Sequence, residues 1–319
     1  MLSGVQMPDK DIGGQAVIEG VMIRSPFRVA TAVRSPEGHI LVSSRPYTGL
    51  TKRHKLLNIP IVRGAISFFE MLAIGIKSLN FSADIAAREP GQSDEPGTAK
   101  GMPVIVLVAT MVIGLGLGIF LFFFVPLWLA QVAGVQKGAL GFNLLAGLIR
   151  VTLFLVYVWI FSLFRDFRRV FEYHGAEHKS IFAHENNEEL TVDAVRRYST
   201  LHPRCGTSFL LIVAMLAILT YSISDSLYQV VTGAPPPLLN RFALHFSLLP
   251  FVAGASYELL KWSGRNRDRR VTRIISAPGL WLQRITTKEP SPEQIEVAIA
   301  AVLTSLDHPI PPSIPVRYS

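Results

Sequence analysis

Four long apolar runs constrain this fold more than any other feature of the sequence. A helix needs about 20 apolar residues to cross the hydrocarbon core of a bilayer, and each run is long enough for one span. The chain also has only 17% charged residues, against about 25% in a typical soluble domain. We therefore expect a mainly α, polytopic membrane helix bundle with four spanning helices, at residues 103–125, 143–164, 207–231 and 240–262.

Arg150 and His245 are two of the ionisable residues within these runs. Arg150 is in the second run and His245 is in the fourth, and each is about two helical turns from one end of its run. Long or amphipathic side chains near a helix end can reach the lipid headgroups, so we expect both residues to do so. Transporters usually carry paired broken helices or charges at mid-membrane. In this chain the charges lie near the ends of the apolar runs, so transport is the weaker functional alternative.

Basic residues are distributed unevenly between the loops. The loop 165–206 and the segment 261–273 are rich in Arg and Lys, whereas Lys137 and Arg241 stand alone in the loops of the other side. The positive-inside rule therefore predicts that 165–206 and both chain termini are cytoplasmic. Topology thus accounts for the formal net charge of +8. We expect membrane lipid and other membrane proteins as partners, and no nucleic acid.

The segments before the membrane region have their own patterns. Residues 1–55 predict a cytoplasmic β-rich element, because 14–46 alternate loosely around a turn at 35–38. We expect one hairpin plus one strand there. Residues 56–88 predict an amphipathic or interfacial helix, and 89–102 are rich enough in Pro, Gly and Ser to predict a flexible linker.

The membrane region, 103–262, precedes a segment, 263–319, that we expect to be a cytoplasmic C-terminal tail with one short helix. Ser291 offers an N-cap for that helix and is followed by a proline, which the first helical position tolerates. The Pro-Gly pair at 278–279 predicts a break in the preceding stretch, and the prolines of 309–315 predict an extended end.

The chemically distinctive residues lie in the loop between the second and third spans. We expect the helix that leaves the membrane at Phe164 to run on to residue 185, which puts His174 and His178 four residues apart on one face. Such a pair is typical of zinc and iron sites. With Glu177 it forms H-x-x-E-H, in which the glutamate of the inverted zinc proteases is the general base. The surrounding sequence does not match that protease superfamily.

Two further ligands are expected just before the third span. His202 and Cys205 lie in HPRCG, whose Pro and Gly keep the segment out of regular structure. Cys205 is near a helix N-terminus and beside Arg204, and both favour the thiolate. A short helix at 190–200, capped by Thr191, lets the chain return to the histidine pair. The expected ligands of one divalent transition metal, zinc first and iron second, are therefore His174, His178, His202 and Cys205.

Other interpretations of these residues stay open. The histidine pair also suits a polar helix face at a headgroup boundary, and Cys205 suits a buried apolar position. If all four residues bind the ion, the site is closed and structural. If Glu177 is a general base, one of the four must stay off the metal. Glu185 and Glu258 are reserve ligands.

A second group of residues lies in GGQAVIEGVMIRSP near the N-terminus. Its glycines allow close backbone approach, and its polar residues lie on expected strand positions. We favour an ordinary strand with hairpin glycines over a substrate-facing edge. The segment contains neither a P-loop nor a dinucleotide fingerprint. The residues concerned are Gly13, Gly14, Gln15, Glu19, Gly20 and Arg24.

Several long motifs occur in order along the chain: GGQAVIEGVMIRSP, PIVRG at 60–64, EYHGAEHKSI at 172–181, HPRCGTSFL at 202–210, YELLKW at 257–262 and PGLWLQRITTKEP at 278–290. Together they resemble the YqhQ-like family of uncharacterised bacterial membrane proteins. The resemblance covers nearly the whole chain. It implies an integral membrane protein that has been described as a predicted metal-dependent enzyme, with the family's HGAEHK and HPRCGT motifs at 174–179 and 202–207.

We therefore expect a multi-pass protein of the bacterial cytoplasmic (inner) membrane with a transition-metal site on its cytoplasmic face. The leading functional hypothesis is a metal-dependent hydrolase in which Glu177 is the catalytic residue. The alternative is a non-catalytic scaffold or accessory subunit with a structural metal, and the weaker alternative is a transporter. Nothing in these residues specifies a substrate.

Overall fold

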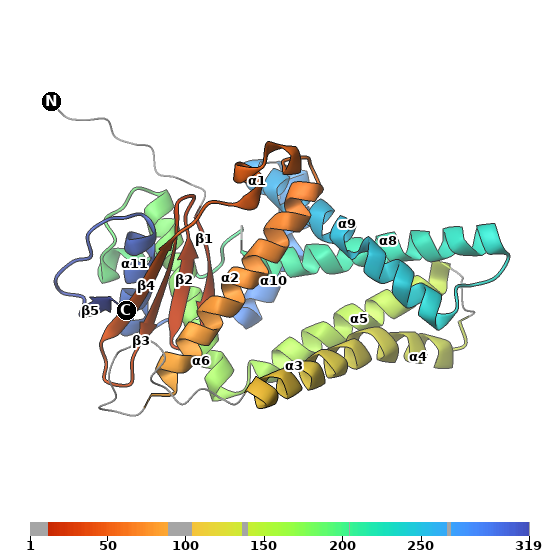
Figure 1. The fold of residues 1–319 in the computed structure, drawn as a ribbon, viewed down its shortest axis with the longest axis horizontal. Helices are drawn as coiled ribbons and strands as arrows, with labels where there is room; N and C mark the ends of the chain where they lie inside the picture. Colours follow the sequence, from red (N-terminus) through yellow and green to blue (C-terminus); the bar gives the residue numbers. More distant parts are fainter. Residues whose placement is uncertain (1–11, 89–103, 136–139, 204, 267–268, 319) are drawn as a thin grey trace.

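The computed structural model describes residues 12–88, 104–135, 140–203, 205–266 and 269–318. Figure 1 shows a small sheet with helices packed on it at one end of the molecule, and long apolar helices that extend away from it. The described part of the chain is mainly helical, as the sequence predicts. The predicted linker at 89–102 and Arg204 lie outside the described residues.

Four helices are long and apolar enough to cross a membrane. The first is built from α3 (Val104–Ile119), a π-helical turn (Phe120–Phe124) and α4 (Val125–Val132), and the others follow the predicted runs closely. The first helix continues through Pro126, beyond the predicted end at residue 125. The other three are α5 (Leu140–Phe161), α8 (Gly206–Thr232) and α9 (Leu238–Arg265).

The prediction that two polar residues inside the runs reach the headgroups is wrong for His245. His245 is 6% exposed, and its Nε2 lies 2.9 Å from Oδ1 of Asp225 on α8. Arg150 donates from Nε to the carbonyl oxygen of Phe122, at 2.7 Å. Pro126, four residues after Phe122, has no N–H to donate to that carbonyl, so its oxygen can accept from this intramembrane cation.

The sheet is larger than the expected hairpin plus one strand. Four consecutive strands form an antiparallel meander, and a fifth strand from the C-terminus pairs parallel with the fourth. The sequence pattern underestimated the sheet because the first strand is short and Gly-rich and the last lies within the expected extended tail. The strands are β1 (Gly13–Val17), β2 (Gly20–Arg24), β3 (Arg28–Arg34), β4 (Ile40–Pro46) and β5 (Val316–Tyr318).

Helices cover both faces of this sheet. Val21 and Ile23 on β2 belong to a buried cluster with α6 (Arg165–Glu185) and α11 (Pro292–Ser305). Met22, between them, belongs to a cluster with α2 (Val62–Ala86) on the opposite face. Neighbouring residues of a strand point to opposite faces, so the alternation of side chains builds two cores. Helix α2 also packs against α9, which joins the sheet to the membrane helices.

The C-terminal segment is not the tail that the sequence suggested. Helix α11 is almost wholly buried against the sheet and α6, although its predicted start is confirmed by a capping box between Ser291 and Gln294. The predicted break at 278–279 is also wrong, since α10 (Arg270–Thr286) continues through Pro278. The side chain of Pro278 is exposed, so it does not disturb the packing of α10. A proline removes one main-chain hydrogen bond from a helix, and the helix can persist where neighbouring elements pack against it.

Helix α6 is separate from the span that precedes it. α5 ends at Phe161, and Phe164 has an extended backbone before α6 begins at Arg165. The expected continuous helix is therefore broken at residues 162–164, and α6 turns onto the sheet (Figure 1). The short helix α7 (Val192–Arg196) follows, and the hydroxyl of Thr191 caps it as predicted.

Candidate metal centre

The second half of α6 carries polar residues into the interior of the protein. Tyr173 through Ile181 are all buried, and they include His174, Glu177 and His178. The two imidazoles lie on one face of the helix with ring centroids 4.4 Å apart. Burial of a polar group is costly unless the group has a partner, so the contacts of these side chains indicate the function of the site.

Main-chain carbonyls orient both imidazoles in the same way. Nδ1 of His174 lies 2.8 Å from the carbonyl oxygen of Thr286, and Nδ1 of His178 lies 2.5 Å from that of Thr200. A carbonyl oxygen only accepts, so each Nδ1 carries the hydrogen and each Nε2 keeps its lone pair. This arrangement is common for metal-binding histidines, whose other nitrogen donates to a carbonyl or carboxylate.

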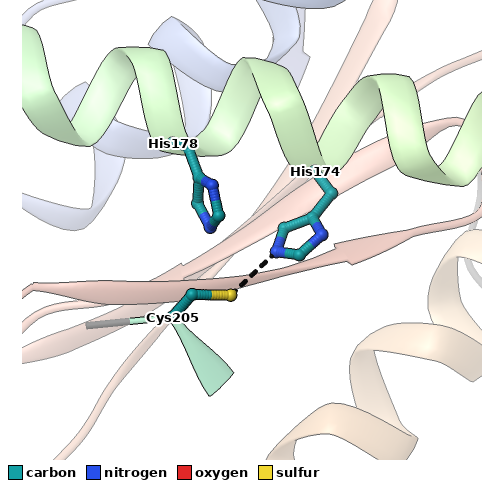
Figure 2. A group of neighbouring side chains, drawn as sticks. All are labelled: His174, His178 and Cys205. Atoms are coloured by element: carbon teal, nitrogen blue, oxygen red, sulfur yellow. Dashed lines mark hydrogen bonds between the residues drawn. The ribbon is translucent and has the colours of Figure 1, made fainter. Parts of the chain in front are cut away.

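Cys205 completes a group of three candidate ligands. Its Sγ lies 3.1 Å from Nε2 of His174, and the ligand atoms of His174, His178 and Cys205 all lie within 4.8 Å of one another. Figure 2 shows the two imidazoles, which project from α6, beside the sulfur of Cys205. His178 also interacts with the side chain of Cys205.

The chemistry of these donors fits a transition metal. Two imidazole nitrogens and one thiolate match the preferences of zinc and of iron, whereas Mg²⁺ and Ca²⁺ prefer oxygen ligands. Burial, together with the neighbouring His174, lowers the pKa of His178 and so favours its neutral, ligating form. Cys205 directly precedes α8, whose positive N-terminal end favours the thiolate.

The segment that carries Cys205 is anchored by α10. The side chain of Gln283, which is fully buried, accepts from the backbone N–H of His202 at 2.8 Å. It also donates to the carbonyl oxygen of His202 at 2.8 Å. Both main-chain groups of one loop residue are therefore paired with a single amide, which fixes the path of the chain three residues before Cys205.

A glycine in α6 brings the helix close to the chain after α10. A Cβ built on Gly175 would lie 2.0 Å from the carbonyl oxygen of Lys288, so only glycine fits at this position. Lys179, one turn further along α6, donates to the carbonyl oxygen of Arg196 at 2.8 Å. These contacts hold α6, the end of α7 and the chain after α10 in one arrangement, on which the two histidine–carbonyl bonds depend.

His202 lies beside this group rather than in it. Its Nε2 is 3.4 Å from Oε1 of Glu185, and both side chains are buried. Its ring is 5.6 Å from that of His178 and 4.4 Å from that of Phe182, measured between centroids. The other reserve ligand, Glu258, accepts from Arg63 at 2.6 and 2.5 Å. The structure thus brings three of the four expected ligands together.

Glu177 lies next to the three candidate ligands and is 4% exposed. Its carboxylate accepts from the backbone N–H of Gly14, and burial raises its pKa from 4.5 to about 8, a rise that His174 opposes. Its Oε2 is buried and has no hydrogen-bond partner within the described residues. One oxygen is therefore positioned by the backbone, and the other is available to a bound group.

The N-terminal glycine motif contributes to this site, which the interpretation as an ordinary strand did not anticipate. A Cβ on Gly14 would lie 2.8 Å from Oε1 of Glu177, so the glycine makes room for the carboxylate. Glu19 of the same motif pairs with Arg169 of α6, and Gln15 packs against Gly75 of α2. In the sequence, the Gly-Gly pair at the start of an expected strand was the feature that could have indicated this close contact.

Other contributors had no readable signal. The carbonyl groups of Thr200 and Thr286 act through the main chain, so their residue types carry no information about the role. Gln283 lies far along the sequence from the residue it holds, and an isolated glutamine in an amphipathic helix has no distinctive spacing. These contacts exist only because the fold places α10 against the loop before α8.

Comparisons with known proteins agree on a relationship for most of the chain. Residues 59–308 match the family described as "Protein of unknown function (DUF1385)". The chain is 34% identical over 296 residues to the "Uncharacterized protein YqhQ" of Bacillus subtilis (strain 168), covering 90% of this chain and 89% of that protein. No solved structure matches the chain. All three candidate ligands lie within the matched region, and Gly14 precedes it.

Proposed function

The chain belongs to the DUF1385 family, and we propose that it is a metal-dependent hydrolase embedded in a membrane. This membership confirms the resemblance to the YqhQ-like proteins. The single observation that carries the proposal is the convergence of His174, His178 and Cys205 beside the buried carboxylate of Glu177. A divalent transition metal, zinc first and iron second, is the ion that these donors suit.

The number of ligands favours catalysis over a purely structural site. Structural zinc sites are usually closed by four protein ligands, whereas catalytic sites keep one position open for water or substrate. Three residues converge here, and His202 is turned toward Glu185. An ion held by these three residues would keep the open position that a hydrolase requires, and Glu177 would act as the base.

Each residue then has a defined task. His174, His178 and Cys205 would hold the ion, and the carbonyls of Thr286 and Thr200 would keep the imidazoles in the ligating tautomer. A bound zinc ion supplies Lewis-acid activation of water and of a carbonyl or phosphoryl oxygen. Glu177 would accept a proton at Oε2, while the N–H of Gly14 holds the carboxylate in place.

We place this centre on the cytoplasmic face of a bacterial inner membrane. The four apolar helices support a multi-pass membrane protein. The sheet includes strands from both ends of the chain, so β1 and β5 lie on the same side of the bundle (Figure 1). The basic segments 165–206 and 261–273 flank the same end, and the positive-inside rule assigns that side to the cytoplasm.

A second function is favoured by the position of the ligands. The histidines belong to α6, which packs on the sheet, and Cys205 immediately precedes the membrane helix α8. An ion shared between them would fasten the sheet domain to the bundle, as a scaffold or accessory subunit with a structural metal requires. The two functions differ in whether the bound ion has an open coordination position.

Cobalt spectroscopy distinguishes these functions without a known substrate. We would load the full-length, detergent-purified protein with Co²⁺ and add acetohydroxamate, a small bidentate ligand. A hydrolase is expected to show thiolate-to-cobalt absorption in the wild type and a shift of the cobalt d–d bands on addition of acetohydroxamate. Cys205→Ala should lose the thiolate band, and His54→Ala, an exposed histidine far along the chain from the centre, should retain both features.

The same preparation tests the role of Glu177. Glu177→Gln should keep the cobalt spectrum but lower hydrolysis of a panel of chromogenic carboxylic and phosphoric esters by about 100-fold or more, the usual effect of removing a general base. Bands that do not respond to acetohydroxamate, with hydrolysis equal in wild type and Glu177→Gln, would support the scaffold. Failure to bind cobalt at all would contradict both functions.

A further inference from the structure

The end of α4, the start of α9 and the loop between α8 and α9 lie remote from the sheet and from α6 (Figure 1), and their residues line a cavity. Its volume is about 820 Å³, within the range of about 300–1,000 Å³ that is typical of ligand pockets. It is bounded by α4, the start of α9 and the loop between α8 and α9. The aromatic residues that line it are Phe120, Phe124, Trp128 and Phe142.

Among the described residues, Arg241 is the buried cation that lines this mainly apolar cavity. Arg241 is 4% exposed, and its guanidinium lies 5.5 Å from the ring centroid of Phe142. Its Nε is 2.9 Å from Oδ2 of Asp225, but its Nη2 is buried with no hydrogen-bond partner within the described residues. A buried donor without a partner is costly, so this nitrogen is suited to an acceptor supplied by a ligand.

The charges around Arg241 leave a positive excess. Asp225 is the acidic residue of α8, and it is shared between Arg241 and His245, whose nitrogens both lie 2.9 Å from its carboxylate. Arg150, on α5, is paired with a main-chain carbonyl and not with a carboxylate. Two arginines, Arg150 and Arg241, are therefore within electrostatic range of one aspartate inside an apolar helix bundle, and an anion would balance the excess charge.

The walls of the cavity indicate where the anion comes from. Phe120, Trp128 and Leu238 line the cavity yet are 58%, 62% and 52% exposed. They lie on helices that are candidate membrane spans, so this exposed surface faces lipid. A ligand that enters from the bilayer brings its own apolar chains, which suit aromatic walls. Gln131 also lines the cavity and adds an amide donor.

From these observations we propose that the cavity binds an anionic membrane lipid. The phosphodiester of the headgroup accepts from Nη2 of Arg241, and an acyl chain lies along Phe120, Phe124 and Trp128. This proposal does not rest on the proposed hydrolase function, because the cavity and the candidate metal centre share no residue. The end of α4 and the start of α9, which line the cavity, lie far from α6 and the sheet (Figure 1).

Native mass spectrometry of the full-length protein in detergent tests this site. We would titrate phosphatidylglycerol and phosphatidylcholine with identical acyl chains, and glycerol phosphate as the free headgroup. The wild type is expected to retain phosphatidylglycerol about tenfold more tightly than phosphatidylcholine and to retain no glycerol phosphate. Both headgroups carry the phosphodiester, but the choline of phosphatidylcholine cancels its negative charge, so only phosphatidylglycerol balances the charge of Arg241. Arg241→Gln should abolish the preference, and Trp128→Ala should weaken retention of both lipids.

Two controls match these variants. Arg28→Gln removes the same charge from a partly exposed ion pair on β3, and Trp159→Ala removes an exposed tryptophan from α5 outside the cavity. Both should behave like the wild type. If Arg241→Gln does not fold, Gln131→Leu and Trp128→Ala test the same cavity. Equal retention of the two lipids by the wild type, or a preference that survives in all cavity variants, would overturn the proposal. Tight binding of glycerol phosphate alone would also do so.

Discussion

The carboxylate of Glu177 on α6 occupies the space that a side chain on Gly14 of β1 would fill, and it accepts a hydrogen bond from the backbone of that glycine. A strand near the N-terminus thus positions the proposed general base of a site whose other residues lie far along the chain. The relationship explains why the sheet, which carries none of the candidate ligands, is packed directly against them.

Gly14→Ala tests this close approach. The added Cβ would meet Oε1 of Glu177 at 2.8 Å and the carbonyl oxygen of Met22 at 2.7 Å, so we expect the free energy of unfolding to fall by about 1–3 kcal/mol. Thermal unfolding in detergent measures the change. Gly13→Ala is the matched control, because a Cβ there has nothing within 4 Å. Equal effects of the two substitutions would contradict the packing described.

Gln283→Leu tests the anchor of the Cys205 segment. The substitution leaves the buried N–H and carbonyl of His202 without their amide partner, and each buried group costs about 1–3 kcal/mol when unpaired. We expect lower stability and at least a tenfold weaker affinity for Co²⁺, measured by titration of the thiolate band. Gln229→Leu, on α8 away from the centre, should keep the wild-type affinity.

Removal of the metal should make stability depend on pH through Glu177. Its pKa in the folded chain is raised from 4.5 to about 8 by burial, so the folded state retains a proton that the unfolded state releases. Stability is therefore fully present below about pH 4.5 and falls as the pH rises toward 8. We expect the Tm of chelator-treated wild type to fall over this range, and the Tm of treated Glu177→Gln to fall less. If the Tm of the two treated proteins fell equally with pH, the carboxyl of Glu177 would not be the cause of the pH dependence.

Asp225→Asn tests the ion cluster within the membrane helices. Asp225 is fully buried between Arg241 and His245, and loss of one partner from a buried ion pair costs about 3–5 kcal/mol because a charge is left uncompensated. Unfolding in detergent should show this loss. Ser224→Ala, one residue away on α8, is the control, and its hydroxyl bonds only within its own helix turn. If both variants were equally stable, the ion pairs of Asp225 would not stabilise the helix bundle as described.

The sequence predicted those parts of the site that depend on local spacing. His174 and His178 share a face because four residues make about one helical turn, and Cys205 is near them because the chain between is short. His202 has the same proximity in sequence, but Gln283, Phe182 and Glu185 turn it aside. Those neighbours belong to α6 and α10, whereas His202 lies in the loop before α8, so the local sequence around His202 does not predict these contacts.

The same distinction applies to the fold. Four membrane helices follow from the length and apolar content of their runs. The burial of α11 and the pairing of β5 with β4 could not be read from the sequence, because both depend on the C-terminal segment returning to a sheet formed near the N-terminus. Likewise, the burial of His245 could not be predicted, because its partner Asp225 lies on a different helix. The sequence alone favoured a position at the headgroups.

Elemental analysis of the full-length, detergent-purified protein tests the central claim most directly. The account predicts about one transition-metal ion per wild-type chain, as a single three-ligand site implies. It predicts little metal in His174→Ala, His178→Ala or Cys205→Ala, and nearly the wild-type content in His202→Ala. Equally low metal in the wild type and in all four variants would contradict it.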